Sequence, residues 1–337
     1  MYKFSDYYFN AKTFIQTNAL NIRRLSVLMF YVTDFCQSKC EHCKIWEKNP
    51  NVEFPFEKFV EVLNSKSVTK KTKIGLEGGE FIFHTEREEM LQYLTDENYT
   101  YEMLTNGLYR TRTVELVRRY KIPKLFISLD GDREGYEKLR GLDGYNKVIE
   151  LIKELHRETE ISLMYTITAW NEVKDLQHVI GVAKKYGLDL RVGIYNNINF
   201  FDTVKEAHTD FDYDGVDLSD FDQNTDYLRL YKEYLSGAVV LPCYSIRQQV
   251  VILPDGSVPI CQLKGDVSLG NVFERSFDEI WNDPKTIAMQ KNYTWCNGCW
   301  INFHRKFEIA LFQKMRYIPR PILKLFVGDY KLGSDFF

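Results

Sequence analysis

Short apolar runs with the character of β-strands alternate with stretches of helical periodicity through the first two thirds of this 337-residue chain. Strands that alternate with helices predict βα units and a parallel sheet with helices outside it. The expected fold class is therefore α/β, with a partial (β/α)6 barrel followed by a small β-hairpin and helix domain. In a barrel of this kind the chemistry sits at the C-terminal ends of the strands.

Polar residues follow the expected strands at those ends. The strands are Val27–Thr33, Lys73–Leu76, Tyr101–Thr105, Leu125–Asp130, Ser162–Thr168 and Leu190–Tyr195. The helices between them are Pro55–Asn64, Thr85–Leu94, Thr111–Tyr120, Tyr145–Glu158 and Val173–Tyr186. Because parallel strands end at one edge of a sheet, the residues at these strand ends are predicted to form a single site. They are Gly78, Gly79, Glu80, Asn106, Ser128 and Thr168.

Seven cysteines lie in groups with the spacing of metal ligands, which indicates a reducing cytoplasm and metal chemistry instead of disulfides. The formal net charge of −3 gives no general attraction to nucleic acid. No apolar run is long enough to span a bilayer. We therefore expect a cytoplasmic protein with no nucleic-acid partner.

The first group is Cys36, Cys40 and Cys43, on a short loop after the first expected strand. Three thiolates can hold three irons of a cubane 4Fe–4S cluster, which leaves the fourth iron open to an exogenous ligand. A zinc site would need a fourth ligand, and His42 has poor spacing for that role. A disulfide framework is typical of small secreted domains and fits this chain less well.

The cysteine triplet followed by Gly78-Gly79-Glu80 resembles the radical S-adenosylmethionine (radical-SAM) superfamily. The resemblance implies that the open iron takes the amino and carboxylate groups of the methionine moiety. One electron from the cluster would then cleave the cofactor to a 5′-deoxyadenosyl radical. It also implies that Glu80 holds the methionine amino group, and that His42 takes the place of an aromatic residue near the adenine. Many family members have proline after the glutamate, where this chain has Phe81.

Ser128-Leu-Asp-Gly followed by Leu-Arg140-Gly resembles a signature of superfamily members with a C-terminal cysteine domain. The resemblance implies that the Ser128 hydroxyl reaches the ribose or the carboxylate of the cofactor, and that Arg140 pairs with the carboxylate. A surface arginine at the start of a helix is the alternative for Arg140. Asn106 and Thr168 are expected to contact the cofactor as well.

The second group of cysteines is Cys243, Cys261, Cys296 and Cys299. A Pro-Asp-Gly turn between two short β segments predicts a hairpin that returns Cys261 beside Cys243. Ser276 with Glu279 three residues later predicts a capped helix leading to Cys296-Asn-Gly-Cys299. Zinc and an iron–sulfur cluster fit four such cysteines equally well.

The sequence around these four cysteines resembles the SPASM and twitch domains attached to radical-SAM enzymes. Four cysteines match the shorter twitch form, which holds one auxiliary 4Fe–4S cluster, and the spacing resembles that of aminocyclitol dehydrogenase-type enzymes. The expected organisation is an N-terminal segment at 1–26, the barrel at 27–236, the auxiliary domain at 237–303 and a helical tail at 304–337.

These resemblances imply an oxidoreductase that removes a hydrogen atom from its substrate and passes an electron to the auxiliary cluster. A small polar metabolite, such as a sugar or an aminocyclitol, is the expected substrate. The alternative is a maturase of a ribosomally made peptide, and a zinc-structured module without catalysis is a third class. Two features favour the metabolite: few residues precede the first strand, and Gln262 stands where sulfatase-maturing relatives have an acidic base.

Two further partners are expected. The predicted chemistry requires an electron donor such as a flavodoxin or a ferredoxin. The stretch Arg305–Leu332 mixes basic and apolar residues, a composition that favours either contact with an anionic membrane surface or a helix that closes the open edge of the barrel.

Overall fold

The computed structural model describes residues 12–17, 20, 22–196, 198, 200, 213, 215–315 and 321. Its main feature is a seven-stranded parallel sheet in the order β6-β5-β4-β3-β2-β1-β7. Six strands follow the sequence prediction closely, and the partial barrel is confirmed. Their bounds are β1 Val27–Thr33, β2 Lys73–Gly78, β3 Thr100–Thr105, β4 Lys124–Ser128, β5 Glu160–Ile167 and β6 Asp189–Ile194, with β7 at Gln249–Ile252.

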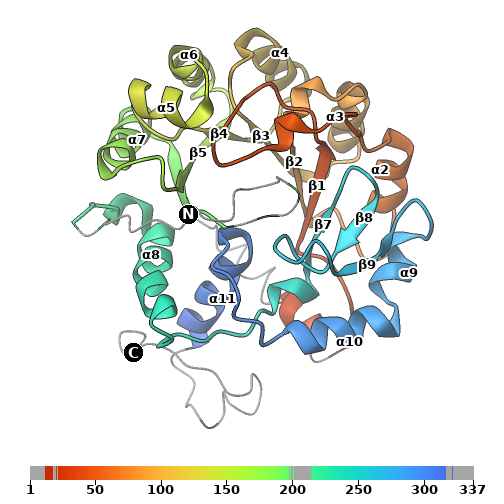
Figure 1. Cartoon of the computed structure of the whole chain (residues 1–337). Helices are drawn as coiled ribbons and strands as arrows, with labels where there is room; N and C mark the ends of the chain where they lie inside the picture. The colour runs from red at the N-terminus through yellow and green to blue at the C-terminus, as the bar shows by residue number, and fades with distance from the viewer. Residues whose placement is uncertain are drawn as a thin grey trace.

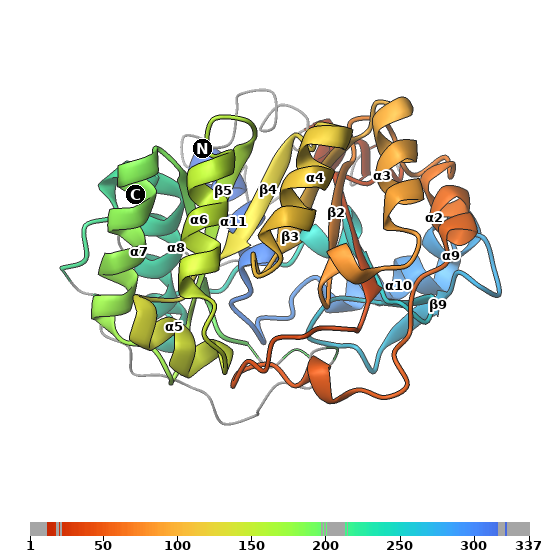
Figure 2. The ribbon, with the colours of Figure 1, turned by 90° about the horizontal axis from the view of Figure 1, so that it is seen from above.

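Helices cover the convex face of this sheet, as Figures 1 and 2 show. The sequence predicts all of them but α5, which lies between β4 and α6. Its boundary signals are present: the Asp132 side chain accepts a hydrogen bond from Gly135 N, and Gly141 ends the helix in the left-handed conformation. The covering helices are α2 Phe56–Leu63, α3 Arg87–Asp96, α4 Arg110–Tyr120, α5 Arg133–Arg140, α6 Tyr145–Leu155 and α7 Val173–Tyr186.

The alternation of side chains along each strand separates the packed core from the barrel interior. On β1, Leu28 and Phe30 are fully buried in the main core cluster, against the helices. Met29 and Tyr31 point to the other face and form a second, small cluster with Val251 of β7. The concave face of the sheet is therefore left for functional side chains.

The seventh strand corrects one prediction. The sequence predicts that β7 forms a hairpin with the segment after the Pro-Asp-Gly turn, but it pairs in parallel with β1. The segment after the turn, β8 (Ser257–Pro259), pairs with β9 (Ser268–Asn271) in a separate antiparallel ribbon. The open edge of β1 offers β7 a full parallel ladder, whereas the turn itself supplies little more than the hydrogen bond from Leu253 N to Ser257 O.

Helices α9 (Phe277–Trp281) and α10 (Pro284–Tyr293) complete the C-terminal part. The predicted cap of α9 is confirmed, because Ser276 and Glu279 form a reciprocal capping box. This part is tied to the barrel at two places. The Asp278 carboxylate accepts hydrogen bonds from Ser67 N and Oγ at 3.0 and 2.7 Å, and Arg23 Nη2 donates to Gln290 Oε1 at 2.6 Å.

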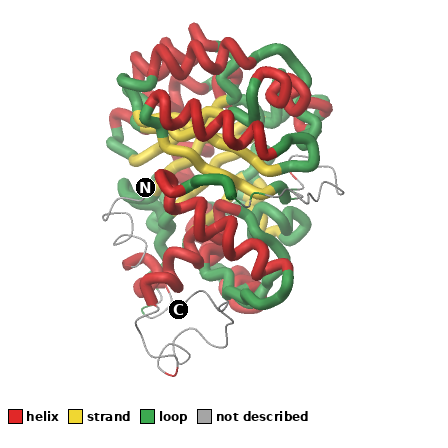
Figure 3. Tube along the Cα trace, turned by 90° about the vertical axis from the view of Figure 1, so that its left-hand side faces the viewer, coloured by secondary structure: helices red, strands yellow, loops and turns green. Residues whose placement is uncertain are grey.

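The concave side of the sheet holds α11 (Asn302–Met315) beside α8 (Asp222–Leu235), as Figures 1 and 3 show. Asn302 Nδ2 donates to Val192 O of β6 at 2.9 Å, so α11 is fixed to the edge strand. The described part of the basic tail is therefore a helix that closes the barrel. Residues 316–337, apart from 321, lie outside the described residues, and the predicted membrane contact falls there. None of the described helices combines the length and apolarity that crossing a bilayer requires.

Candidate functional site

The loop after β1 carries Cys36, Cys40 and Cys43. It packs against two glycines so closely that neither position has room for a side chain. A Cβ atom on Gly79 would collide with the Phe35 carbonyl oxygen, and one on Gly141 would collide with the carbonyl oxygen of Lys39. Hydrogen bonds from Gly79 N to Thr33 O and from Glu80 N to Phe35 O, both at 2.7 Å, fix the start of the loop. In the structure, the Gly78-Gly79 pair leaves room for the backbone of the cysteine loop. Its contact with a cofactor stays a prediction.

Glu80 is held at the top of β2 and is 1% exposed. Its Oε1 accepts a hydrogen bond from Thr105 Oγ1 and its Oε2 accepts one from Asn106 N, both at 2.8 Å. Burial raises its pKa to about 7, although both hydrogen bonds favour the charged form. Each carboxylate oxygen can accept a second hydrogen bond, so the geometry is compatible with the expected contact to an ammonium group.

We expect Glu80→Ala to weaken binding of S-adenosylmethionine by about 1.5–3 kcal/mol, the usual contribution of a hydrogen bond to a charged group. Equilibrium dialysis of the anaerobic protein measures this change. Thr105→Val is the matched control, because it removes one partner of Glu80 but leaves the carboxylate in place. Equal losses in the two variants would show that Glu80 only supports the strand ends.

Arg140 is buried at the end of α5, so the alternative of a surface arginine at a helix start is wrong. Its Nε donates to Asp130 Oδ2 at 2.8 Å, Nη2 donates to the same oxygen, and Nη1 lies 3.6 Å from Cys40 Sγ. Asp130 Oδ1 accepts a hydrogen bond from Thr166 N at 3.1 Å. Asp130 therefore links the cysteine loop to two strands.

A cavity of about 1470 Å³ extends from the cysteine loop into the barrel. Thr168 is not among the described residues that line it, because its hydroxyl and backbone amide both bond to Asn171 Oδ1, at 3.3 and 2.9 Å. Thr166, two residues earlier on β5, lines the cavity instead. The other predicted residues of this site do line it: Cys36, Cys40, His42, Cys43, Gly78, Gly79, Glu80, Asn106, Ser128 and Arg140.

The cysteine loop fits a bound polar group. Gln37 Oε1, Ser38 Oγ and His42 Nδ1 are buried and have no hydrogen-bond partner within the described part of the chain. Burial also raises the pKa of the Cys36 and Cys43 thiols to about 12, with the Glu80 carboxylate adding to the shift at Cys36. No three cysteine, histidine or carboxylate side chains of the described residues converge on one point. A cubane, which takes one thiolate per iron, needs no such convergence.

The second group of cysteines is gathered around a buried arginine that the sequence pattern does not reveal. Arg305 of α11 is fully buried, and its Nε and Nη2 donate to the carbonyl oxygens of Cys299 and Cys296 at 3.0 and 3.3 Å. Its Nη1 donates to Leu241 O at 3.1 Å, so one side chain ties the segment of Cys296 and Cys299 to the segment that leads to Cys243. Burial raises the pKa of the Cys243 and Cys261 thiols, and the Cys299 thiol adds to both shifts.

If both groups hold the predicted cubanes, the reconstituted protein should contain about eight irons. Replacing Cys36, Cys40 and Cys43 together should remove roughly half of them, because the C-terminal group is assembled from other elements. Metal analysis of the purified variants tests this. Zinc at the four C-terminal cysteines would contradict the prediction of an auxiliary cluster.

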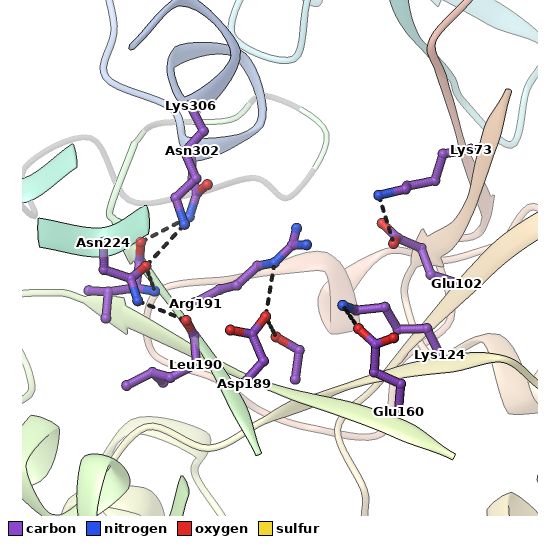
Figure 4. A network of polar contacts seen from close by, with 12 residues as sticks. Lys73, Glu102, Lys124, Glu160, Asp189, Leu190, Arg191, Asn224, Asn302 and Lys306 are labelled. Atoms are coloured by element: carbon purple, nitrogen blue, oxygen red, sulfur yellow. Dashed lines mark hydrogen bonds and ion pairs between the residues drawn. The ribbon is translucent and has the colours of Figure 1, made fainter. Parts of the chain in front are cut away.

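Charged side chains line the deeper part of the cavity, as Figure 4 shows for several of them. Lys73 lies 3.8 Å from the Glu102 carboxylate, and Arg191 Nε lies 4.0 Å from the Asp189 carboxylate. Lys306 of α11 donates to Asn224 Oδ1 at 3.0 Å, and burial with the nearby Arg191 charge lowers its pKa well below the usual range. The cavity therefore has a polar floor.

Family models match the two parts of the chain separately. The model described as "Radical SAM superfamily" matches residues 30–180, and the SPASM model, described as "Iron-sulfur cluster-binding domain", matches residues 243–300. The first match contains Cys36, Cys40 and Cys43, and the second contains all four C-terminal cysteines.

Two curated proteins are similar over most of the chain. The antilisterial bacteriocin subtilosin biosynthesis protein AlbA of Bacillus subtilis strain 168 is 26% identical, over 82% of this chain and 69% of its own. The Fe-coproporphyrin III synthase of Methanosarcina barkeri is 24% identical, over 76% of this chain and 73% of its own.

Solved structures share the fold. Streptococcus suis SuiB bound to S-adenosylmethionine superposes with a TM-score of 0.62 at 17% identity, over 86% of this chain and 74% of its own. SuiB bound to the precursor peptide SuiA gives a TM-score of 0.61 at 15% identity, over 86% and 72%.

Proposed function

Because this chain is a radical-SAM protein with a SPASM-type iron–sulfur domain, we propose that it modifies a ribosomally made peptide by radical chemistry. The observation that carries the proposal is the similarity over 82% of the chain to a bacteriocin biosynthesis protein. The complex of SuiB, a protein of the same fold, with the precursor peptide SuiA supports it. The comparisons thus favour the peptide alternative over the small polar metabolite that the sequence suggested.

We assign the two cofactors to the two cysteine groups. Cys36, Cys40 and Cys43 would hold the S-adenosylmethionine-binding 4Fe–4S cluster, and Cys243, Cys261, Cys296 and Cys299 would hold the auxiliary cluster. When bound, these cofactors supply the one-electron chemistry that removes hydrogen from an unactivated C–H bond.

The protein's own part is to bind, orient and shield. Glu80, fixed by Thr105 and Asn106, presents a carboxylate to the cofactor's ammonium group. Arg140, fixed by Asp130, places a positive charge beside Cys40. The cavity below brings the substrate to the same strand ends, and α11 closes the barrel behind it. Shielding of this kind prevents side reactions of a reactive species.

A small-molecule substrate is the second candidate. The similarity to an Fe-coproporphyrin III synthase favours it, at nearly the same identity and coverage. An iron porphyrin carries carboxylates, which would need cations in the cavity. Several lysines and arginines line it, and two of them, Lys73 and Arg191, have the carboxylates of Glu102 and Asp189 beside them.

The test uses the reconstituted protein with S-adenosylmethionine, a reductant and peptides encoded beside its gene. A peptide substrate should show a mass change and increase 5′-deoxyadenosine formation, both measured by mass spectrometry. Fe-coproporphyrin III and a panel of sugars and aminocyclitols serve as parallel substrates. Turnover of one of these without modification of any peptide would overturn the proposal.

A further inference from the structure

Glu77 is a charged residue of the barrel interior to which the proposed chemistry gives no role. It lies on β2, three residues before Glu80, and its side chain lines the cavity. Its register partner on β1 is Tyr31, whose hydroxyl accepts a hydrogen bond from Gln262 Nε2 at 2.6 Å. Glu77 therefore lies at the level where the barrel and the segment after Cys261 meet.

The Glu77 carboxyl group differs from the other interior charges because it lacks a partner. Within the described residues, no hydrogen bond or ion pair involves it. In contrast, Glu102 has Lys73, and Asp189 accepts a hydrogen bond from Ser162 Oγ at 3.0 Å and lies near Arg191 (Figure 4). An unpaired carboxylate at a cavity wall favours a ligand that supplies a donor or a positive charge.

A second carboxylate lies one level deeper. Glu102 on β3 is the register partner of Gly75, which has no side chain, so Glu77 is the next inward side chain of β2 above it. Burial, then the Glu102 charge, raises the pKa of Glu77 to about 8, while Arg191 opposes the shift. Two carboxylates that repel each other are stabilised by a cation between them.

Of the nearby cations, Lys73 lies beside Glu102, 3.8 Å from its carboxylate, and the other two do not fill this role. The Arg191 guanidinium lies over the Phe126 ring, 4.6 Å from its centroid, and its Nε lies 4.0 Å from the Asp189 carboxylate. Lys306 donates to Asn224 Oδ1 at 3.0 Å, and burial, with the Arg191 charge, lowers its pKa well below the usual range. Arg191 and Lys306 thus interact with other partners. A ligand that carries a positive charge would therefore contact the carboxylates of Glu77 and Glu102.

We propose that Glu77 and Glu102 form a binding site for a cationic group of the substrate, an ammonium or a guanidinium, in the cavity below the cysteine loop. That this group is a lysine or arginine side chain of a peptide rests on the proposed function. The preference of the two carboxylates for a cation does not depend on the proposed function.

The test measures binding of n-propylguanidinium and of its neutral analogue n-propylurea to the anaerobic holoenzyme by isothermal titration calorimetry. The guanidinium should bind roughly tenfold or more tightly than the urea, which is the effect of a hydrogen bond to a charged group. Glu77→Gln should remove this preference, whereas the exposed control Glu57→Gln should retain it. Equal binding of the two probes, or an unchanged preference in Glu77→Gln, would overturn the proposal.

The pH dependence gives a second readout. Guanidinium stays charged throughout, so its affinity should rise roughly tenfold between about pH 7 and pH 9 as Glu77 loses its proton. Tyr31, Glu102 and Arg191 interact electrostatically with Glu77, and Lys73 and Lys306 line the same cavity. Of these, Lys306 could give a rise of the same sign. A rise that persists in Glu77→Gln would therefore assign the titration to Lys306 and contradict the proposal.

Folding is checked by circular dichroism and iron content. If Glu77→Gln is misfolded, the Glu77→Asp variant tests the proposal instead. It keeps the negative charge, so it should still bind the guanidinium more tightly than the urea. Its affinity for the guanidinium should be lower than that of the wild type, because the shorter side chain reaches less far into the cavity. Loss of the preference in a folded Glu77→Asp variant with unchanged affinity for the urea would also overturn the proposal. The measurement needs no peptide, so its failure and that of the peptide assay are distinguishable.

Discussion

Cys40→Ala is expected to abolish 5′-deoxyadenosine formation from S-adenosylmethionine, down to the level of a reaction without protein. The reason is that the predicted cluster on the first loop depends on all three thiolates, and Cys40 is the most buried of them. Liquid chromatography of the acid-quenched reaction, with dithionite as reductant, measures the product.

The matched control is Cys261→Ala, which removes a thiolate from the C-terminal group and should leave cofactor cleavage largely intact. Iron content is measured in parallel, because a metal site contributes directly to folding free energy. Undiminished 5′-deoxyadenosine from a folded Cys40→Ala variant would refute the assignment of the first loop.

Asp130→Ala is expected to lower the free energy of unfolding by about 3–5 kcal/mol, the cost of breaking a buried ion pair by removing one partner. The variant leaves the buried Arg140 guanidinium without its carboxylate and Thr166 N without its acceptor. Because Arg140 also contacts Cys40, the iron content of the first loop should fall as well. Denaturant unfolding under anaerobic conditions, followed by circular dichroism, measures the stability.

Glu158→Ala provides the comparison. Glu158 pairs with Arg118 at 2.7 Å on the surface, where both side chains are more than a third exposed. Such pairs contribute about 0–1 kcal/mol, so this variant should unfold close to the wild type. A loss from Asp130→Ala no larger than that from Glu158→Ala would show that the buried pair is not needed for folding.

The sequence predicted the strands well because most of their residues are buried, so each strand is marked by a short apolar run. The cysteines were found from spacing alone. Asp130 and Arg305 were missed because their roles depend on partners far along the chain. Asp130 looks like an ordinary Asp-Gly turn until Arg140 is placed beside it, and Arg305 looks like one cation of a basic tail until α11 is buried.

The sequence also did not predict that β7 pairs with β1. Val250, Val251 and Ile252 have the pattern of a strand, but strand pattern does not name a partner. A turn next to a strand favours a hairpin, whereas the free edge of β1 belongs to residues more than two hundred positions earlier in the chain. The two alternatives differ in tertiary context, which local patterns do not contain.

Thr168 is a related case, since a two-residue shift along β5 separates it from the cavity that Thr166 lines.

The pairing of β1 with β7 has a consequence for biosynthesis. As the ribosome makes the chain, β1 gains β2 as a neighbour early, but its other edge waits until residues 249–252 emerge. During that interval the nascent chain exposes unpaired backbone N–H and C=O groups, which invite pairing with other chains. A contact that spans so much sequence also slows folding. Recovery of the protein from an expressing cell is therefore expected to depend on chaperone supply during translation, and added chaperones should raise the yield.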